Sequence, residues 1–127
     1  MPKLLLVDDS IVARMSLKAC LPKDEHELVE CEDGSRAIEL FQTEHPDVTF
    51  MDLTMPGVDG MQALQEIMTV APQATVIILT ADTQRKTIDQ ALKLGAFAVV
   101  KKPPTRDDVL AELEKALAAQ NKPQLAP

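Results

Sequence analysis

The sequence predicts an α/β protein in which one parallel sheet lies between two layers of helices, a doubly wound (βα)5 sandwich. Two patterns predict this fold. Four short, nearly continuous apolar runs, typical of strands buried on both faces, and one short run with acidic residues alternate with five segments in which apolar residues recur at helical spacing. The connections between them are short, as in βα units whose strands run parallel. The pattern is that of a flavodoxin-like, three-layer sandwich.

Length and composition exclude several classes of protein. The 127 residues suit one domain that can bury a core without metal or disulfide support. A net charge of −7 argues against a nucleic-acid partner, because phosphate binding needs a clustered basic surface. Cys20 and Cys31 lie beside apolar residues without metal-ligand spacing, so we interpret them as core residues. The apolar run after Lys3 is too short for a signal peptide or membrane span, and we expect a cytoplasmic protein that binds no membrane.

The first half of the chain predicts two strand–helix units. Residues 3–7 form the first strand, and Ser10 is the N-cap of a helix that ends before Pro22. Residues 27–31 carry acidic side chains that suit a strand near the sheet edge. A second helix starts at Ser35 and ends before Pro46. The residues expected to face inward from the two helices are Ala13, Leu17, Cys20, Leu21, Ala37, Ile38, Leu40 and Phe41. His26 and His45 are expected on the surface.

The second half predicts three more units. Strands are expected at residues 48–52, 75–79 and 97–100. Asp59 and Thr105 are N-cap candidates for the third and fifth helices, residues 81–83 lead into the fourth, and Gly95 suits its C′ position. The expected inward-facing residues are Ala63, Leu64, Ile67, Met68, Ile88, Ala91, Leu92, Val109, Leu110, Leu113 and Leu117. We predict one domain over residues 3–119, and residues 120–127 as a tail or the start of a linker.

Polar residues follow four of the predicted strands. The carboxyl ends of parallel strands meet at one edge of a sheet, which brings together Asp8, Asp9, Asp52, Thr80 and Lys102. Asp at a strand end is also an ordinary turn residue, and the Asp52 strand alone favours neither interpretation. Three neighbouring carboxylates repel one another unless protons or a cation intervene, and an all-oxygen ligand set suits Mg²⁺. A carboxylate beside such an ion can attack phosphorus, while an ammonium and a hydroxyl neutralise the incoming phosphoryl group.

The order of these motifs resembles the receiver domain of two-component response regulators, of the CheY-like single-domain type. The resemblance covers residues 3–117 and depends on Val7-Asp8-Asp9-Ser10, the stretch from Met51 to Gly60, Thr80-Ala81, Gly95-Ala96 and Lys102-Pro103. It implies a five-stranded parallel sheet with strand order 2-1-3-4-5. It also implies a magnesium site in which Asp9 and Asp52 are ligands, Asp8 acts largely through water, and Thr54 contributes its backbone carbonyl.

The resemblance further implies that Asp52 is the phosphoacceptor, Thr80 the switch hydroxyl and Lys102 the phosphoryl contact, with a cis peptide between Lys102 and Pro103. The donor would be a sensor histidine kinase or a phosphotransfer protein, and the output would reach an unidentified downstream protein. A phosphorylation-dependent dimer is left open. Such a domain catalyses only its own phosphotransfer and slow dephosphorylation.

Two positions depart from the family pattern. Val99 stands three residues before Lys102, where many receivers carry Tyr or Phe, so a coupled threonine–aromatic switch is not expected. Pro104 replaces a larger apolar residue and should stiffen the entry to the last helix. Ile11 and Met15 lie off the inward face of the first helix, near the acidic pair. Chance exposure is the ordinary explanation for them, and docking of the donor kinase is the sharper hypothesis.

Three alternatives remain beside a phosphorylated signalling module. A degenerate receiver would act by binding alone. A phosphatase with an aspartyl intermediate usually has a second acid two residues after the nucleophile, where this chain has Thr54. A flavin or nucleotide binder would need a phosphate-cradling loop and favours a stacking aromatic residue, but no loop is rich enough in Gly, Ser and Thr, and Trp and Tyr are absent.

Overall fold

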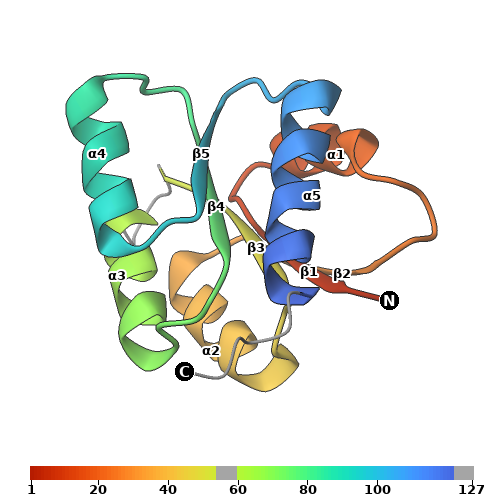
Figure 1. Ribbon diagram of the computed structural model, residues 1–127, viewed down its shortest axis with the longest axis horizontal. Coiled ribbons are helices and arrows are strands. Elements are labelled where there is room, and N and C mark those ends of the chain that lie inside the picture. Colours follow the sequence, from red (N-terminus) through yellow and green to blue (C-terminus); the bar gives the residue numbers. More distant parts are fainter. Residues whose placement is uncertain (54–59, 122–127) are drawn as a thin grey trace.

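A computed structural model describes residues 1–53 and 60–121 (Figure 1). Strands and helices alternate along the chain, as the sequence predicts. The strands are β1 (Lys3–Val7), β2 (Glu27–Cys31), β3 (Val48–Asp52), β4 (Val76–Thr80) and β5 (Ala98–Lys101). The helices are α1 (Ile11–Cys20), α2 (Gly34–Glu44), α3 (Gly60–Val70), α4 (Arg85–Leu94) and α5 (Arg106–Asn121).

The strands form one parallel sheet in the order β2-β1-β3-β4-β5, which confirms the predicted fold. The sequence starts in the middle of the sheet, moves outward to β2, and returns across β1 to the other side. The reversal places a crevice between the carboxyl ends of β1 and β3, where α/β sheets of this kind bind ligands. In the register, Val7 pairs with Met51 and Asp52 with Leu79. The carboxyl ends of β1, β3 and β4 therefore lie at a common edge of the sheet.

Side chains alternate between the two faces of the sheet, as strand geometry requires. One core packs against α2, α3 and α4, and it contains Leu5, Met51, Ile78 and Ile67. The other core packs against α1 and α5 and contains Leu6, Phe50, Ile77 and Leu113. Figure 1 shows the corresponding helix layers, with α1 and α5 together on one side of the sheet. The neighbouring strands β1 and β3 are therefore buried on both faces.

Capping residues define several helix ends. The Ser10 hydroxyl accepts a hydrogen bond from Ala13 N, and the Thr105 hydroxyl accepts one from Asp108 N, so both predicted caps are confirmed. The second helix starts one residue earlier than predicted, because the Asp33 carboxylate accepts from Ser35 N and leaves Gly34 inside the first turn. The predicted cap Asp59 lies outside the described residues.

Two other predictions, for Leu92 and for the end of the last helix, differ from the structure. Leu92 was expected to face inward but is 45% exposed, because the short α4 buries only a narrow stripe centred on Ala91. The fourth helix begins at Arg85, so residues 81–83 lead into it as predicted, and the Asp82 carboxylate accepts a hydrogen bond from Gln84 N in the preceding turn. The last helix continues to Asn121, two residues past the predicted domain boundary, since the next proline in the sequence is Pro123.

Both cysteines are buried free thiols, as expected for core residues. Cys31 belongs to the core that faces α2, and Cys20 to the core that faces α5. His45 is an exposed residue in the left-handed conformation that ends α2. Among the described helices, none has the length and apolar composition needed to cross a membrane.

Candidate functional site

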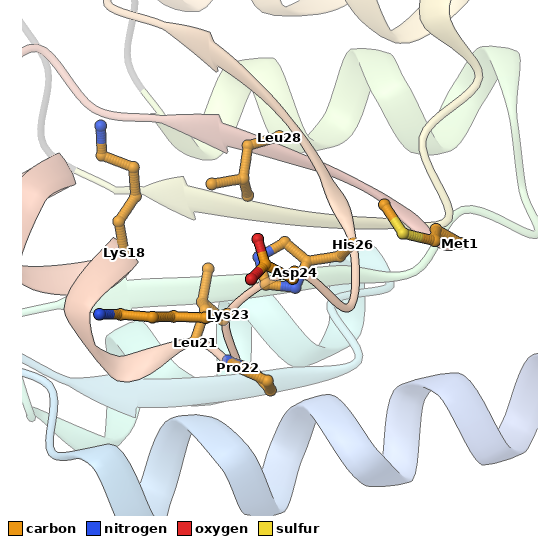
Figure 2. Close-up of a pocket in the computed structure, with 8 residues that line it drawn as sticks. All are labelled: Met1, Lys18, Leu21, Pro22, Lys23, Asp24, His26 and Leu28. Carbon is orange, nitrogen blue, oxygen red and sulfur yellow. The ribbon is translucent and has the colours of Figure 1, made fainter.

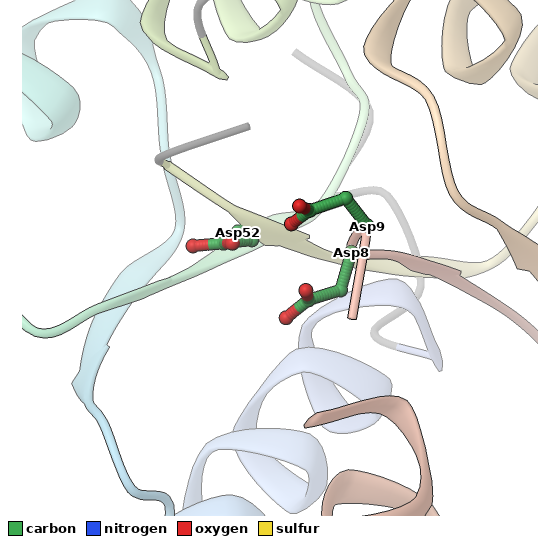
Figure 3. Close-up of side chains that lie close together, drawn as sticks. All are labelled: Asp8, Asp9 and Asp52. Carbon is green, nitrogen blue, oxygen red and sulfur yellow. The ribbon is translucent and has the colours of Figure 1, made fainter. Parts of the chain in front are cut away.

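Three carboxylates converge at the carboxyl edge of the sheet (Figure 3). Asp8 and Asp9 follow β1, and Asp52 is the last residue of β3. One carboxylate oxygen from each residue lies within 4.8 Å of the others. Asp8 and Asp52 are buried, at 4% and 5% exposure, whereas Asp9 is exposed. The site is thus a half-open group of acids at the position that the strand ends predict.

Asp8 is held by the start of the first helix as well as by the sheet. Its Oδ1 accepts a 2.9 Å hydrogen bond from Ser10 N, and its backbone N donates to Cys31 O at 3.0 Å. The same serine caps α1 through its hydroxyl. One short turn therefore ends the strand, orients a buried carboxylate and starts a helix.

Lys102 reaches the acids from the end of β5. Its Nζ lies 2.8 Å from Asp8 Oδ2 and 3.2 Å from Asp52 Oδ2, and the Lys102–Pro103 peptide is cis, as expected. Burial disfavours the ammonium, but hydrogen bonds and charge attraction from Asp8 and Asp52 outweigh it and raise the pKa of Lys102 above its usual value. The lysine is therefore a cation at neutral pH, fixed beside two carboxylates.

Thr80 ends β4 next to the lysine. It is buried at 2% exposure, its carbonyl accepts from Lys102 N at 2.8 Å, and its Oγ1 accepts from Asp82 N at 2.9 Å. The structure thus places Thr80 at the same edge as Asp8, Asp52 and Lys102. The predicted backbone ligand Thr54 lies outside the described residues.

The beginning of α3 passes very close to the end of β3. A Cβ atom built on Gly60 would lie 2.4 Å from Leu53 O and 2.6 Å from Asp52 O. The backbone N of Gly60 donates to Leu53 O at 3.1 Å. Only glycine permits this approach, which stabilises the strand end that carries Asp52. The sequence shows the glycine, but not which backbone it contacts.

Arg14 also contacts the acidic site, in a way that the sequence does not reveal. Its guanidinium donates to the backbone carbonyl of Asp8 and to the carboxylate of Glu30 on β2. Neither contact has a signal in the sequence, because both depend on how α1 lies against the sheet.

In the described part of the chain, one hollow beside the acids and another at the far end of α1 lie on the side of the sheet that α1 covers. The one beside the acids, of about 260 Å³, is lined by Asp8, Lys102 and apolar residues that include Leu17 and Pro104. A larger one, of about 610 Å³, lies at the other end of α1 (Figure 2). Its lining mixes Leu21 and Leu28 with Lys18, Lys23, Asp24 and His26 and contains none of the three clustered acids. The reactive groups Asp8 and Lys102 therefore line the smaller hollow, and Pro104 forms part of its wall.

The ligand set fits a hard divalent cation. Its donors are carboxylate oxygens alone, and the exposed Asp9 leaves one side open to water, which Mg²⁺ retains in protein sites. Among the described residues this is the one group of three acidic, histidine or cysteine side chains close enough to share an ion.

Comparisons with known proteins agree with this geometry. Residues 4–114 match the model of the response regulator receiver domain family. The chemotaxis protein CheY of Bacillus subtilis is 38% identical over 116 residues, which cover 91% of this chain and 97% of that protein. A CheY-like receiver domain protein from Methanospirillum hungatei shares the fold, with a TM-score of 0.88 at 22% identity over 96% of this chain and 98% of that one.

A second solved structure is that of a related protein in a complex whose name includes ligands. It is the CheX–CheY–BeF3–Mg complex from Borrelia burgdorferi, with a TM-score of 0.85 at 26% identity over 91% of this chain and 88% of that chain. Domains of this kind are phosphorylation-dependent signalling modules of two-component systems, not classical enzymes, and they typically use Mg²⁺. With the family model spanning most of its length and the acids, threonine and lysine at one sheet edge, the chain belongs to the response regulator receiver domain family.

Proposed function

We propose that Asp52 accepts a phosphoryl group from a histidine kinase or phosphotransfer protein and that the modified domain changes its binding to a downstream protein. The observation that carries the proposal is the position of Lys102 Nζ, 2.8 Å from Asp8 and 3.2 Å from Asp52. A buried carboxylate beside a fixed ammonium can act as nucleophile, because the cation offsets the charge that the phosphoryl oxygens bring.

In the proposed reaction, an Asp52 carboxylate oxygen forms the new bond to phosphorus. The bond from phosphorus to the donor nitrogen breaks, and its electron pair leaves with the donor imidazole. Lys102 pairs with a phosphoryl oxygen, and the Thr80 hydroxyl donates to another. Asp8, Asp9, Asp52 and the Thr54 carbonyl would hold Mg²⁺, which when bound neutralises charge on the phosphoryl oxygens. Slow dephosphorylation by water would reset the domain.

Signal output through an aromatic switch is not part of the proposal. Val99 is partly buried and packs against the core that faces α3 and α4. It pairs with Ile78 in the sheet, so the side chain three residues before Lys102 already packs in the interior. The Thr80 hydroxyl accepts a hydrogen bond from Asp82 N, in the loop between β4 and α4. This bond gives a route from the site to α4.

The donor would dock near the start of α1. Ile11 and Met15 are 62% and 60% exposed, one turn apart, on the helix that begins two residues after Asp9. A kinase that phosphorylates Asp52 must approach this edge, and these side chains offer an apolar contact there. Replacing both by Ser should slow phosphotransfer from the cognate kinase while leaving labelling by acetyl phosphate unchanged. Equal kinase rates would remove this surface from the proposal.

The test of function is the intact mass after incubation with acetyl phosphate and Mg²⁺. We expect one phosphoryl adduct that hydroxylamine removes, that EDTA prevents, and that Asp52→Ala lacks. Asp107→Ala, which changes an exposed acid on α5, is the matched control and should be labelled normally. A labelled Asp52→Ala would refute the phosphoacceptor assignment. An unlabelled wild-type protein, beside a control receiver that is labelled, would favour a degenerate receiver that signals by binding alone.

A further inference from the structure

Arg14 connects three parts of the molecule at the edge of the site. It lies in the first turn of α1, and its side chain is only 11% exposed. The guanidinium donates through Nε to Glu30 Oε1 at 3.0 Å and through Nη1 to the backbone carbonyl of Asp8. The other Glu30 oxygen accepts from Lys18 Nζ at 3.0 Å. Glu30 thus anchors Arg14 from β2, while Arg14 holds the carbonyl that precedes Asp9.

The Asp8 carbonyl belongs to the peptide group that leads into Asp9. Because a peptide group is planar, fixing its oxygen also fixes its nitrogen and the direction in which the chain enters Asp9. The Asp8 side chain has further restraints, from Ser10 N and Lys102 Nζ. Within the described residues, no hydrogen bond or ion pair restrains the exposed Asp9 carboxylate. Its position relative to Asp8 and Asp52 is therefore set by its backbone.

We infer that Arg14 is a positioning residue for the acidic site: it orients the Asp8–Asp9 peptide so that the Asp9 carboxylate can share a divalent cation with Asp52. The inference rests on the proposed function, since it assigns a purpose to the acids as a magnesium site. The planar guanidinium is suited to this role, because it can donate to a carboxylate and a carbonyl in two fixed directions at once. Partners of this kind outside the ligand set commonly change metal affinity by about 10–100-fold.

Charge alone makes the opposite prediction. Arg14 is a cation near a site for a divalent cation, so its removal should strengthen Mg²⁺ binding if the charge is all that matters. If Arg14 orients Asp9, its removal should weaken binding in spite of the lost repulsion. Lys18 supplies a matched control, because it binds the same Glu30 carboxylate but makes no hydrogen bond to Asp8.

The experiment measures the dissociation constant of Mg²⁺ alone by isothermal titration calorimetry, on the full chain. The variants are Arg14→Met, Arg14→Lys, Lys18→Met and Asp9→Asn. We expect the first two to weaken Mg²⁺ binding by about tenfold or more. Lys18→Met should bind as the wild type does or slightly more tightly. Far-UV circular dichroism in EDTA shows whether each variant is folded, and Arg14→Lys, which keeps the charge, is the second test if Arg14→Met does not fold.

Each contrary result overturns either the positioning role of Arg14, the importance of its contact with the Asp8 carbonyl, or the metal site itself. If Asp9→Asn weakens binding but both Arg14 variants bind normally or more tightly, Arg14 has no positioning role. If Lys18→Met weakens binding as much as Arg14→Met, the ion pairs between α1 and β2 matter and the Asp8 carbonyl contact does not. If the wild-type protein binds no Mg²⁺, the metal site of the proposed function fails, and the role of Arg14 fails with it.

Discussion

Gly60→Ala is the perturbation that tests most directly how the fold holds Asp52. The new Cβ would lie 2.4 Å from Leu53 O, and ordinary contact begins at 3.4 Å, so the backbone must separate by about 1 Å (3.4 minus 2.4). The nearest atoms belong to the backbone, which cannot rotate away as a flexible side chain can. The displaced segment includes the Asp52 carbonyl, 2.6 Å from the same Cβ.

The cost can be estimated from two opposing effects. Overpacking of this kind costs about 1–3 kcal/mol, and the helix propensity of Ala returns at most about 1 kcal/mol at this first position of α3. We expect a net loss of about 1–2 kcal/mol in the free energy of unfolding, which lowers the melting temperature by about 3–8 °C. A displacement of about 1 Å at a reacting group can cost up to about 100-fold in rate, so phosphorylation of Asp52 should slow at least about tenfold.

Urea unfolding followed by far-UV circular dichroism suits a chain without Trp or Tyr, and intact mass against time in acetyl phosphate gives the phosphorylation rate. Gln65→Ala, an exposed substitution on the same helix, is the control and should stay within about 0.5 kcal/mol of the wild type. A Gly60→Ala protein as stable and as rapidly phosphorylated as the wild type would refute the reasoning. Lost stability with an unchanged rate would show that Asp52 does not move with the strand end.

Three further predictions concern the interior. Thr49→Val should raise the free energy of unfolding by about 1 kcal/mol, because Thr49 Oγ1 is buried without a hydrogen-bond partner in the described part of the chain; a lower urea midpoint would contradict this. Gly95→Ala should lower the free energy of unfolding by about 1–2 kcal/mol, since Gly95 has φ = 113° and the new Cβ would lie 2.8 Å from Met68 Cε. An unchanged thermal unfolding midpoint would show that the backbone at residue 95 and the Met68 side chain relax easily. Burial raises the pKa of the Cys31 thiol, so in a Cys20→Ser background its alkylation should be slow at pH 8 and accelerate at a higher pH than in the urea-unfolded protein. Matching pH profiles in the two states would be evidence against that shift.

The sequence was sufficient for those parts of the site that depend on strand ends. Asp8, Asp52, Thr80 and Lys102 could be placed together, because each follows an apolar run and parallel strands finish at one edge. The order of the strands was not available from periodicity and came from the resemblance to a family.

Contacts that depend on helix placement were not predictable in the same way. The apolar spacing on α4 suggested that Leu92 faces inward, but a short helix with a narrow contact leaves it exposed. Arg14 could be recognised as a basic residue near the acids, whereas its bonds to Glu30 and to the Asp8 carbonyl require the position of α1 against β2. The role of Gly60 likewise requires the structure, because only the structure shows that its backbone contacts the end of β3.

The division of the interior into two separate cores has a consequence for how such a domain diversifies. Ile67 and Leu113 lie on opposite faces of the sheet and belong to different cores, so the stability effects of substitutions at these positions should add. Substitutions that adapt α1 and α5 to a new partner therefore need no compensating substitution in the core that packs against α3 and α4. Substitutions on the two faces of the sheet can thus accumulate in separate evolutionary steps, around an unchanged set of strands.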